Sequence, residues 1–404
     1  MTRVKLFSKV NASRGEVPGF IHDKDKRGRT NVRPLLFDDR GGSQRTDVSD
    51  YFRKNWRLRI IDCGLEHARS ISILLSPIIS LMSSPSAIPQ SVIVIGGTIA
   101  IDHVKTPEAE GANLLGGSAA YAALAASFFS RPVSLIGIIG HDFPQEHLAM
   151  LEGRGVLLDG VERSENESFT WSGEYHANMN ERTTHRVGLN VLESWQVKVP
   201  AVSAGAQIVV LANMSPDNQM EMLGQCGISE RGTGERFVIA DTMDLWIEIA
   251  NERLHEVLPH LDLFVLNEGE ARELAGTSNL IKAGGLLLEK GPKHVVVKLG
   301  EFGAILFSSN SAGSGIELFR ASAWPLEAVA DPTGAGDTFL GAMAGYLAAQ
   351  GAPPYDTAAL RQAIVQGSML ASFTCEAFST RRLEELSMED LAERLELFRA
   401  ATAW

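Results

Sequence analysis

The segment best suited to chemistry is Asp331-Pro-Thr-Gly-Ala-Gly-Asp-Thr-Phe339. Two aspartates flank three small residues: Gly334, Ala335 and Gly336. Apolar residues follow as far as Gln350, which predicts a helix that begins at the glycines, where free backbone N–H groups and the helix dipole attract anions. Asp337 would then be a carboxylate base beside an anion-binding turn, as phosphoryl transfer to a hydroxyl requires. For Asp337 alone, stabilisation of the helix N-terminus would be the simpler explanation.

A second polar motif, Asn267-Glu-Gly-Glu270, follows the apolar run at 263–266. The run predicts a buried strand, so the motif lies at the carboxyl end of that strand and opens the next helix. An amide and a carboxylate suffice for Mg²⁺, which keeps most of its water and needs few protein ligands. A helix cap made by Asn267, followed by an acidic first turn, would explain the same residues without a metal.

Both motifs resemble one family. D-x-x-G-A-G-D-x-F is the C-terminal signature of the ribokinase-like (PfkB-type) carbohydrate kinases, and residues 331–339 match it without a gap. Asn267 and Glu270 match the N-x-x-E motif of that family. The resemblance covers about residues 91–400. It implies a kinase that uses ATP and Mg²⁺, in which Asp337 deprotonates the acceptor hydroxyl, the turn amides bind the transferring phosphate, and Asn267 and Glu270 hold Mg²⁺ through water.

The resemblance also implies the two substrate sites. Acceptor contacts would come from four residues: Asp102, Gly116, Gly117 and Asp337. Nucleotide contacts would come from seven residues: Lys298, Gly300, Gly303, Thr333, Gly334, Gly336 and Ser368. Some relatives bind K⁺ beside the positions matching Asp331 and Thr333. The chain departs from the family at Tyr121, where an asparagine is common, so part of the usual set of acceptor contacts is absent.

Four further polar residues are candidates for the site. Asn213 and Asp241 end predicted strands on the same edge of the sheet, where they would support the phosphates or Mg²⁺. Arg182 and Arg186 lie in a predicted hairpin. They would bind a phosphate carried by the acceptor, or form a solvated edge of the hairpin.

Apolar runs alternate with helical segments from residue 91 onward, which predicts a three-layer α/β fold with a mostly parallel central sheet. The predicted strands lie at 92–95, 133–139, 208–211, 237–240, 263–266 and 295–297. Segments near 98–106 and 165–192 break this rhythm and predict a small β-sheet lid, the latter as a hairpin turning at 178–181. In it, Trp171 and Tyr175 are expected to pack on the strand face, with stacking on a sugar or base as the alternative.

Composition narrows the functional classes. The chain has 404 residues and a net charge of −12, and the acidic residues concentrate after residue 89. This balance disfavours nucleic acid as a partner. Three scattered cysteines predict a reducing, cytoplasmic environment, and no apolar run reaches the length of a membrane span. The G-x-x-x-x-G-K-[ST] sequence of a P-loop is absent, so a P-loop nucleotide site is excluded.

Residues 1–89 differ from the remainder, since they are basic and lack a sustained helix or strand period. We expect a disordered N-terminal extension, or sequence that precedes a true start near Met82, and a kinase domain at 90–404. The expected activity is phosphorylation of a primary hydroxyl on a sugar. The alternatives are a nucleoside kinase and a non-catalytic sugar- or nucleotide-binding regulator. A homodimer formed through the lid is a further expectation from the family.

Overall fold

The computed structural model describes residues 19–24, 30–35, 92–229, 235–309 and 315–403. Within the first 76 residues, β1 (Gly19–Lys24) and β2 (Thr30–Leu35) pair antiparallel. No strand is expected there from the sequence, because both segments mix charged and apolar residues without alternation. The remaining expectations for residues 1–89, including the start near Met82, lie outside the described residues.

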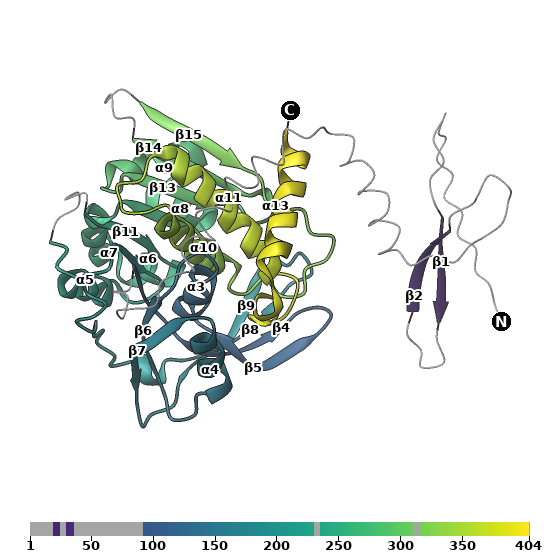
Figure 1. The fold of residues 1–404 in the computed structure, drawn as a ribbon, viewed down its shortest axis with the longest axis horizontal. Helices are drawn as coiled ribbons and strands as arrows, with labels where there is room; N and C mark the ends of the chain where they lie inside the picture. Colours follow the sequence, from purple (N-terminus) through teal and green to yellow (C-terminus); the bar gives the residue numbers. More distant parts are fainter. Residues whose placement is uncertain (1–18, 25–29, 36–91, 230–234, 310–314, 404) are drawn as a thin grey trace. The chain divides into compact units, whose positions relative to one another are not determined.

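The predicted mostly parallel sheet is confirmed (Figure 1). Its strands, in spatial order, are β15 (Ile316–Ala321), β14 (Ala304–Ser309), β13 (His294–Lys298), β12 (Leu263–Asn267), β11 (Phe237–Asp241), β10 (Ile208–Leu211), β3 (Ile93–Gly96), β6 (Val133–Ile139) and β7 (Val156–Arg163). Only the pairs that β14 makes with β13 and β15 are antiparallel. The polar residues that end β11, β12 and β13 therefore meet at one edge of the sheet.

Helices cover both faces of this sheet. One face carries α3 (Ser118–Ala126), α4 (Gln145–Gly153), α10 (Ala335–Ala349), α11 (Thr357–Thr374), α12 (Arg381–Glu385) and α13 (Met388–Thr402). The other carries α5 (Pro216–Gln225), α6 (Asp244–Ile249), α7 (Asn251–Val257), α8 (Glu268–Ala275) and α9 (Leu280–Glu289). Successive strand residues alternate between the two cores, as Ile93 and Val94 do, because side chains on a strand point to opposite faces.

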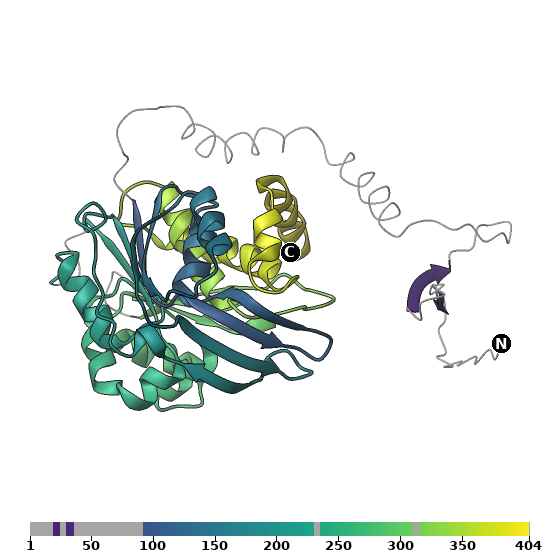
Figure 2. The same cartoon turned by 90° about the horizontal axis from the view of Figure 1, so that it is seen from below.

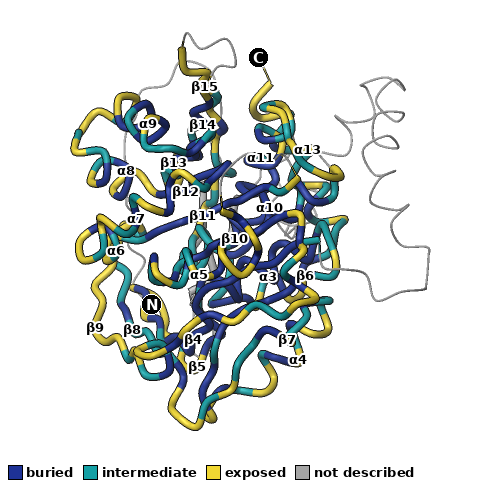
Figure 3. The backbone as a smooth tube through the Cα atoms, turned by 90° about the vertical axis from the view of Figure 1, so that its left-hand side faces the viewer, coloured by how far each residue is buried: buried dark blue, intermediate teal, exposed yellow. Residues whose placement is uncertain are grey.

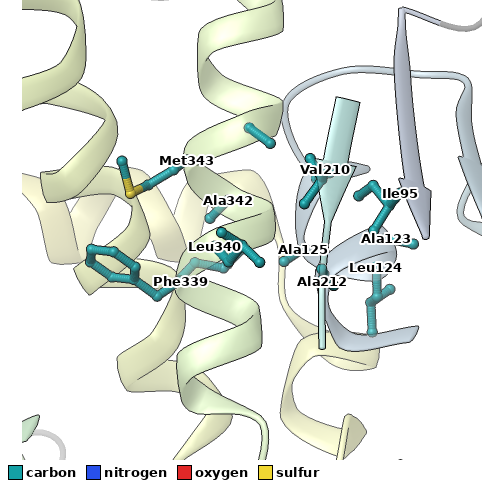
Figure 4. Close-up of a cluster of buried hydrophobic side chains, with 14 of the residues drawn as sticks. Ile95, Ala123, Leu124, Ala125, Val210, Ala212, Phe339, Leu340, Ala342 and Met343 are labelled. Carbon is teal, nitrogen blue, oxygen red and sulfur yellow. The ribbon is translucent and has the colours of Figure 1, made fainter. Parts of the chain in front are cut away.

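The core beneath α3 and α10 holds the catalytic candidates in place (Figure 4). Leu340 and Met343 of α10 are fully buried in one cluster with Ile95 and Val210 of the sheet. All nine residues of α3 are buried, and most are alanine, so the two helices approach closely. Because α10 is anchored along its apolar length, its N-terminus is held firmly at the sheet edge.

A second sheet of four strands forms the predicted lid. Its order is β5 (Glu110–Gly116), β4 (Ala100–Lys105), β8 (Phe169–Tyr175) and β9 (Arg182–Gly188), and we call it the lid sheet. β4 and β8 are parallel, whereas the outer pairs are antiparallel. In Figure 2 the blue and teal strands of the lid sheet extend beyond the helical layers. The last strand, β9, is exposed along nearly its whole length (Figure 3).

Four strands differ from expectation. The sequence does not predict β5, β7, β14 or β15. The lid therefore has one strand more than the predicted segments supply, and the large sheet has three more. Short 3₁₀ helices lie at Asn190–Leu192 (η1), Leu258–His260 (η2) and Gly300–Phe302 (η3). Among the described residues, no helix is both long enough and apolar enough to span a membrane.

Candidate active site

The N-terminus of α10 is built from a left-handed turn on an aromatic ring. Gly334 caps the helix at φ 75°, a conformation that costs an L-residue about 1–2 kcal/mol. A Cβ atom at this position would also overlap the ring of Tyr121, which lies buried on α3. Tyr121 thus supports the turn from below. The predicted helix start is confirmed, and the helix ends at Ala349, one residue before the predicted end.

The three turn amides are not equivalent. The N–H of Ala335 donates to the carbonyl of Pro332 at 3.2 Å. The amides of Gly334 and Gly336 donate to no backbone carbonyl within the described part of the chain. Of the predicted anion-binding amides, these two are therefore the ones that face outward without a backbone partner.

Asp337 lies in the first turn of α10 between positive charges. The side chain of Lys298, at the end of β13, reaches Gly336, so its ammonium group lies over the turn. Burial raises the pKa of Asp337 above its usual value, although the charges of Lys298 and Arg182 oppose this rise. The charge of Arg182, an exposed residue of the hairpin, also opposes the rise in the pKa of Glu270. A partly desolvated carboxylate beside two cations is suited to accept a proton where phosphate binds.

Asn267 and Glu270 form a reciprocal capping box at the start of α8. The Asn267 side chain accepts from the Glu270 amide at 2.9 Å, and the Glu270 carboxylate accepts from the Asn267 amide at 2.7 Å. The structural explanation for this motif is therefore present. Glu270 is nonetheless buried, and burial raises its pKa, with Lys298 as the main opposing charge. The capping box fixes the pair at the edge where Lys298 and Asp241 also end their strands.

Asp241 supplies an oxygen that needs a partner. It is 3% exposed, and its Oδ1 atom has no hydrogen-bond partner among the described residues. Its pKa lies well above the usual value, because of burial first and of the negative charge of Asp337 next. An unpaired buried carboxylate oxygen is costly, so a bound cation would stabilise it.

These groups fit a hydrated divalent cation. Carboxylate and amide oxygens are the donors that Mg²⁺ prefers, and the ion keeps several water molecules. The described residues contain no cluster of three or more His, Cys, Asp or Glu side chains that would form a closed metal cage. An open, partly hydrated site fits the pattern of Asp241, Asn267 and Glu270.

Asp102 lies on β4, within electrostatic reach of Asp331 and Asp337. It is 5% exposed, and its carboxyl group occupies the space that a side chain at Gly116 would need. Gly117 begins α3 at φ 91°, where a Cβ atom would overlap the backbone of Thr98. Burial, with the charges of Asp331 and Asp337, raises the pKa of Asp102 to about 8. The structure thus brings Asp102, Gly116 and Gly117 together near Asp337.

Asp331 is held by a residue that the sequence does not single out. One of its oxygens accepts from the Thr333 amide at 2.9 Å, and the other accepts from the Ser379 amide at 3.1 Å. Ser379 has a φ of 56°, and its hydroxyl donates to the carbonyl of Leu115 at 2.6 Å. Its side chain also lies close to the Tyr121 hydroxyl. Only its unusual backbone geometry, which the sequence does not reveal, marks this position.

The lid hairpin touches the rest of the site at two points. The Thr333 hydroxyl donates to the Tyr175 hydroxyl at 3.3 Å, and burial raises the pKa of Tyr175 to about 12. At the hairpin tip, the Asn180 amide donates to the Glu301 carboxylate at 3.2 Å. Glu301 lies in η3, between the predicted nucleotide contacts Gly300 and Gly303.

The remaining predicted residues lie farther along the same region or make other contacts. Ser368 is buried on α11, one residue after Gly367, which packs against Phe339 of α10. Asn213 accepts from the Trp246 indole N–H at 2.8 Å, so its side chain fastens α6 to the end of β10. Arg186 lies across from Ser172 on the hairpin, and no hydrogen bond or ion pair among the described residues links it to the turn.

Residues 90–386 match the sequence model of the pfkB family carbohydrate kinases. The chain belongs to this family. Members are phosphotransferases with an alcohol acceptor, and this chain is accordingly a kinase with a sugar or nucleoside acceptor. Among curated relatives, the cytidine kinase of Thermococcus kodakarensis is 28% identical over 258 residues, which cover 63% of this chain and 88% of that enzyme.

Solved structures show the same ribokinase-like fold. The nucleoside kinase of Methanocaldococcus jannaschii superposes with a TM-score of 0.59 at 19% identity, covering 76% of this chain and 98% of that one. Ribokinase II of E. coli in complex with ATP and Mg²⁺ superposes with a TM-score of 0.60 at 20% identity, covering 77% and 99%. At these identities the likeness concerns the fold alone.

Proposed function

We propose that this pfkB-family kinase transfers the γ-phosphate of ATP to a primary hydroxyl of a sugar or nucleoside, with Asp337 as the general base. The observation that carries the proposal is the position of Asp337. It is a partly buried carboxylate in the first turn of α10, within electrostatic reach of Asp102 and of Lys298, whose ammonium group lies beside Gly336. Such a base contributes about 10²–10⁴ to the rate of proton transfer.

In this proposal each residue has one task. Asp102 accepts hydrogen bonds from acceptor hydroxyls, and Gly116 and Gly117 allow the acceptor to approach the backbone. Asp337 removes the proton from the attacking hydroxyl. The amides of Gly334 and Gly336 and the ammonium of Lys298 stabilise the negative charge on the transferring phosphoryl group.

The nucleotide site comprises the remaining predicted residues. The triphosphate would run from the α10 turn toward Lys298, with Thr333 beside it, while Gly300, Gly303 and Ser368 line the nucleoside end. When bound, Mg²⁺ neutralises the phosphates, and Asn267, Glu270 and Asp241 would hold it through water. Any K⁺ beside Asp331 would meet a carboxylate whose two oxygens each already accept one N–H group.

The kinase activity is assigned to residues 90–404, with residues 1–89 as an extension. Small molecules are the proposed partners, rather than nucleic acid or a membrane, and the cytoplasm is the proposed compartment. A homodimer would form through the lid sheet, whose strand β9 leaves its polar and apolar side chains exposed.

The test is ADP release from ATP and Mg²⁺ by the full chain, with ribose, fructose, 2-keto-3-deoxygluconate, a hexose phosphate, adenosine, inosine and cytidine as acceptors. Asp337→Asn should retain ATP binding and lose at least about 100-fold in kcat. The matched control is Asp217→Asn. Asp217 is also an aspartate in the first turn of a helix, α5, but it is exposed and pairs with Arg253.

The two variants separate catalysis from helix stabilisation. Loss of turnover in Asp337→Asn but not in Asp217→Asn supports the general base. Equal, small effects in both would mean that Asp337 only stabilises its helix. ATP binding without turnover on any acceptor would favour the non-catalytic regulator.

A further inference from the structure

The side of the lid sheet that faces the catalytic turn can be read from its register. Tyr175 faces the turn, because its hydroxyl meets Thr333. Trp171 lies four residues earlier on β8 and therefore shares this face. Asp102 pairs with Trp171 across β4 and β8, and Asp102 also points toward the turn. The indole of Trp171 thus lies beside the acceptor carboxylate, on the face turned toward Asp337.

The indole of Trp171 is held flat along its strand. Its six-membered ring occupies the space that a side chain at Gly173 would fill. Its N–H donates to the Thr184 hydroxyl on β9 at 3.3 Å. Trp171 is partly exposed, so solvent reaches part of its side chain. A fixed and partly exposed aromatic ring can serve as a stacking platform.

The apolar surface continues beyond the indole. Val187 is paired with Trp171 across β8 and β9, and it is 50% exposed. Strands lie about 4.8 Å apart, so Val187 is about 10 Å from the strand that carries Asp102. A sugar whose hydroxyls bind Asp102 would leave this surface uncovered. An aromatic base attached to the sugar would cover it.

We propose that Trp171 is the residue that selects a nucleoside over a free sugar, by stacking on the base while Asp102 binds the sugar hydroxyls. This inference rests on the proposed function and assigns its acceptor. A flat aromatic base presents a whole π-face to the indole, and stacking tolerates different bases because each has such a face. Val187 extends the shelf under the outer edge of the base.

The decisive variant is Trp171→Leu in the full chain, which keeps apolar bulk and removes the aromatic ring. We expect kcat/KM for adenosine, inosine and cytidine to fall on the order of 10- to 100-fold, mainly through KM. kcat/KM for ribose should be unchanged. Trp171→Phe should retain most of the nucleoside activity. The matched control is Ser172→Ala on the same strand, which should alter neither acceptor.

A second measurement does not depend on turnover. Without ATP, nucleoside should quench the tryptophan fluorescence of the wild-type protein, ribose should not, and Trp171→Leu should lose the quenching. Three results would each overturn the assignment. Trp171→Leu could lose activity on ribose and on nucleosides equally, it could keep wild-type nucleoside kinetics, or it could change the oligomeric state of the protein. If the wild-type protein phosphorylates nothing, the proposed function fails, and the quenching still tests the stacking platform.

Discussion

Asp102→Asn should make the protein more stable than the wild type by an amount that grows with pH. The pKa of Asp102 is raised from 3.8 to about 8 in the folded protein, because the group is buried beside Asp331 and Asp337. A raised folded pKa contributes stability that is complete below 3.8 and is lost as pH rises toward 8. Within this window, the free energy of unfolding falls by about 1.4 kcal/mol for each unit by which the pH rises.

Between pH 5 and pH 8, the contribution of Asp102 to the free energy of unfolding of the wild type should therefore fall by about 4 kcal/mol. Asparagine does not titrate and loses none, and the carboxyl groups other than Asp331 and Asp337, which interact with Asp102, cancel between the two proteins. Urea denaturation at pH 5, 6, 7 and 8 gives the two free energies of unfolding. A difference that stays constant across this range would mean that Asp102 is already ionised in the folded protein, and the reasoning would fail.

Two further predictions concern the turn. Arg182→Gln should raise the pKa of Asp337 and move the acid limb of the pH profile of kcat/KM to higher pH. Arg186→Gln, on the same strand, should leave that limb in place. Superimposable profiles for the two variants would contradict the assigned effect of the Arg182 charge on Asp337. Gly334→Ala should lower the free energy of unfolding by about 2–5 kcal/mol in urea denaturation, from the left-handed backbone and from overlap with the Tyr121 ring. In a Tyr121→Ala background, Gly334→Ala should cost only the backbone part, about 1–2 kcal/mol, and wild-type stability of Gly334→Ala alone would rule out the described packing.

The central strands were predictable because they are buried on both faces and therefore consist of unbroken apolar residues. Strand β6 matches its predicted bounds, and β10 does as well. Strand β5 reads Glu-Gly-Ala-Asn-Leu-Leu-Gly, and most of its first four residues are exposed. It therefore has neither an unbroken apolar run nor an alternation of polar and apolar residues. Strand β15 exposes nearly all its side chains at the sheet edge. Such strands are specified by pairing with a neighbour, which local sequence does not encode.

The residues of the candidate site also divide into those that local sequence predicts and those that it does not. The residues of the turn and of the Asn267 motif were predictable, because a helix start after a strand is a local pattern. The side chains that surround them were not, because they arrive from distant elements. The unpaired oxygen of Asp241 and the ring of Tyr121 under Gly334 depend on tertiary packing alone. Tyr121 was visible in the sequence only as a departure from a family pattern.

The bond between Ser379 and Leu115 links residues 264 positions apart. During synthesis at 5–20 residues per second, Leu115 would leave the ribosome roughly 13–50 seconds before Ser379. Strand β5 and the helix that follows it must therefore wait for the C-terminal part of the chain before the carbonyl of Leu115 finds its donor. The same wait applies to Asp331, whose second oxygen needs the same serine. The proposed acceptor site is consequently among the last parts of the nascent chain to be completed.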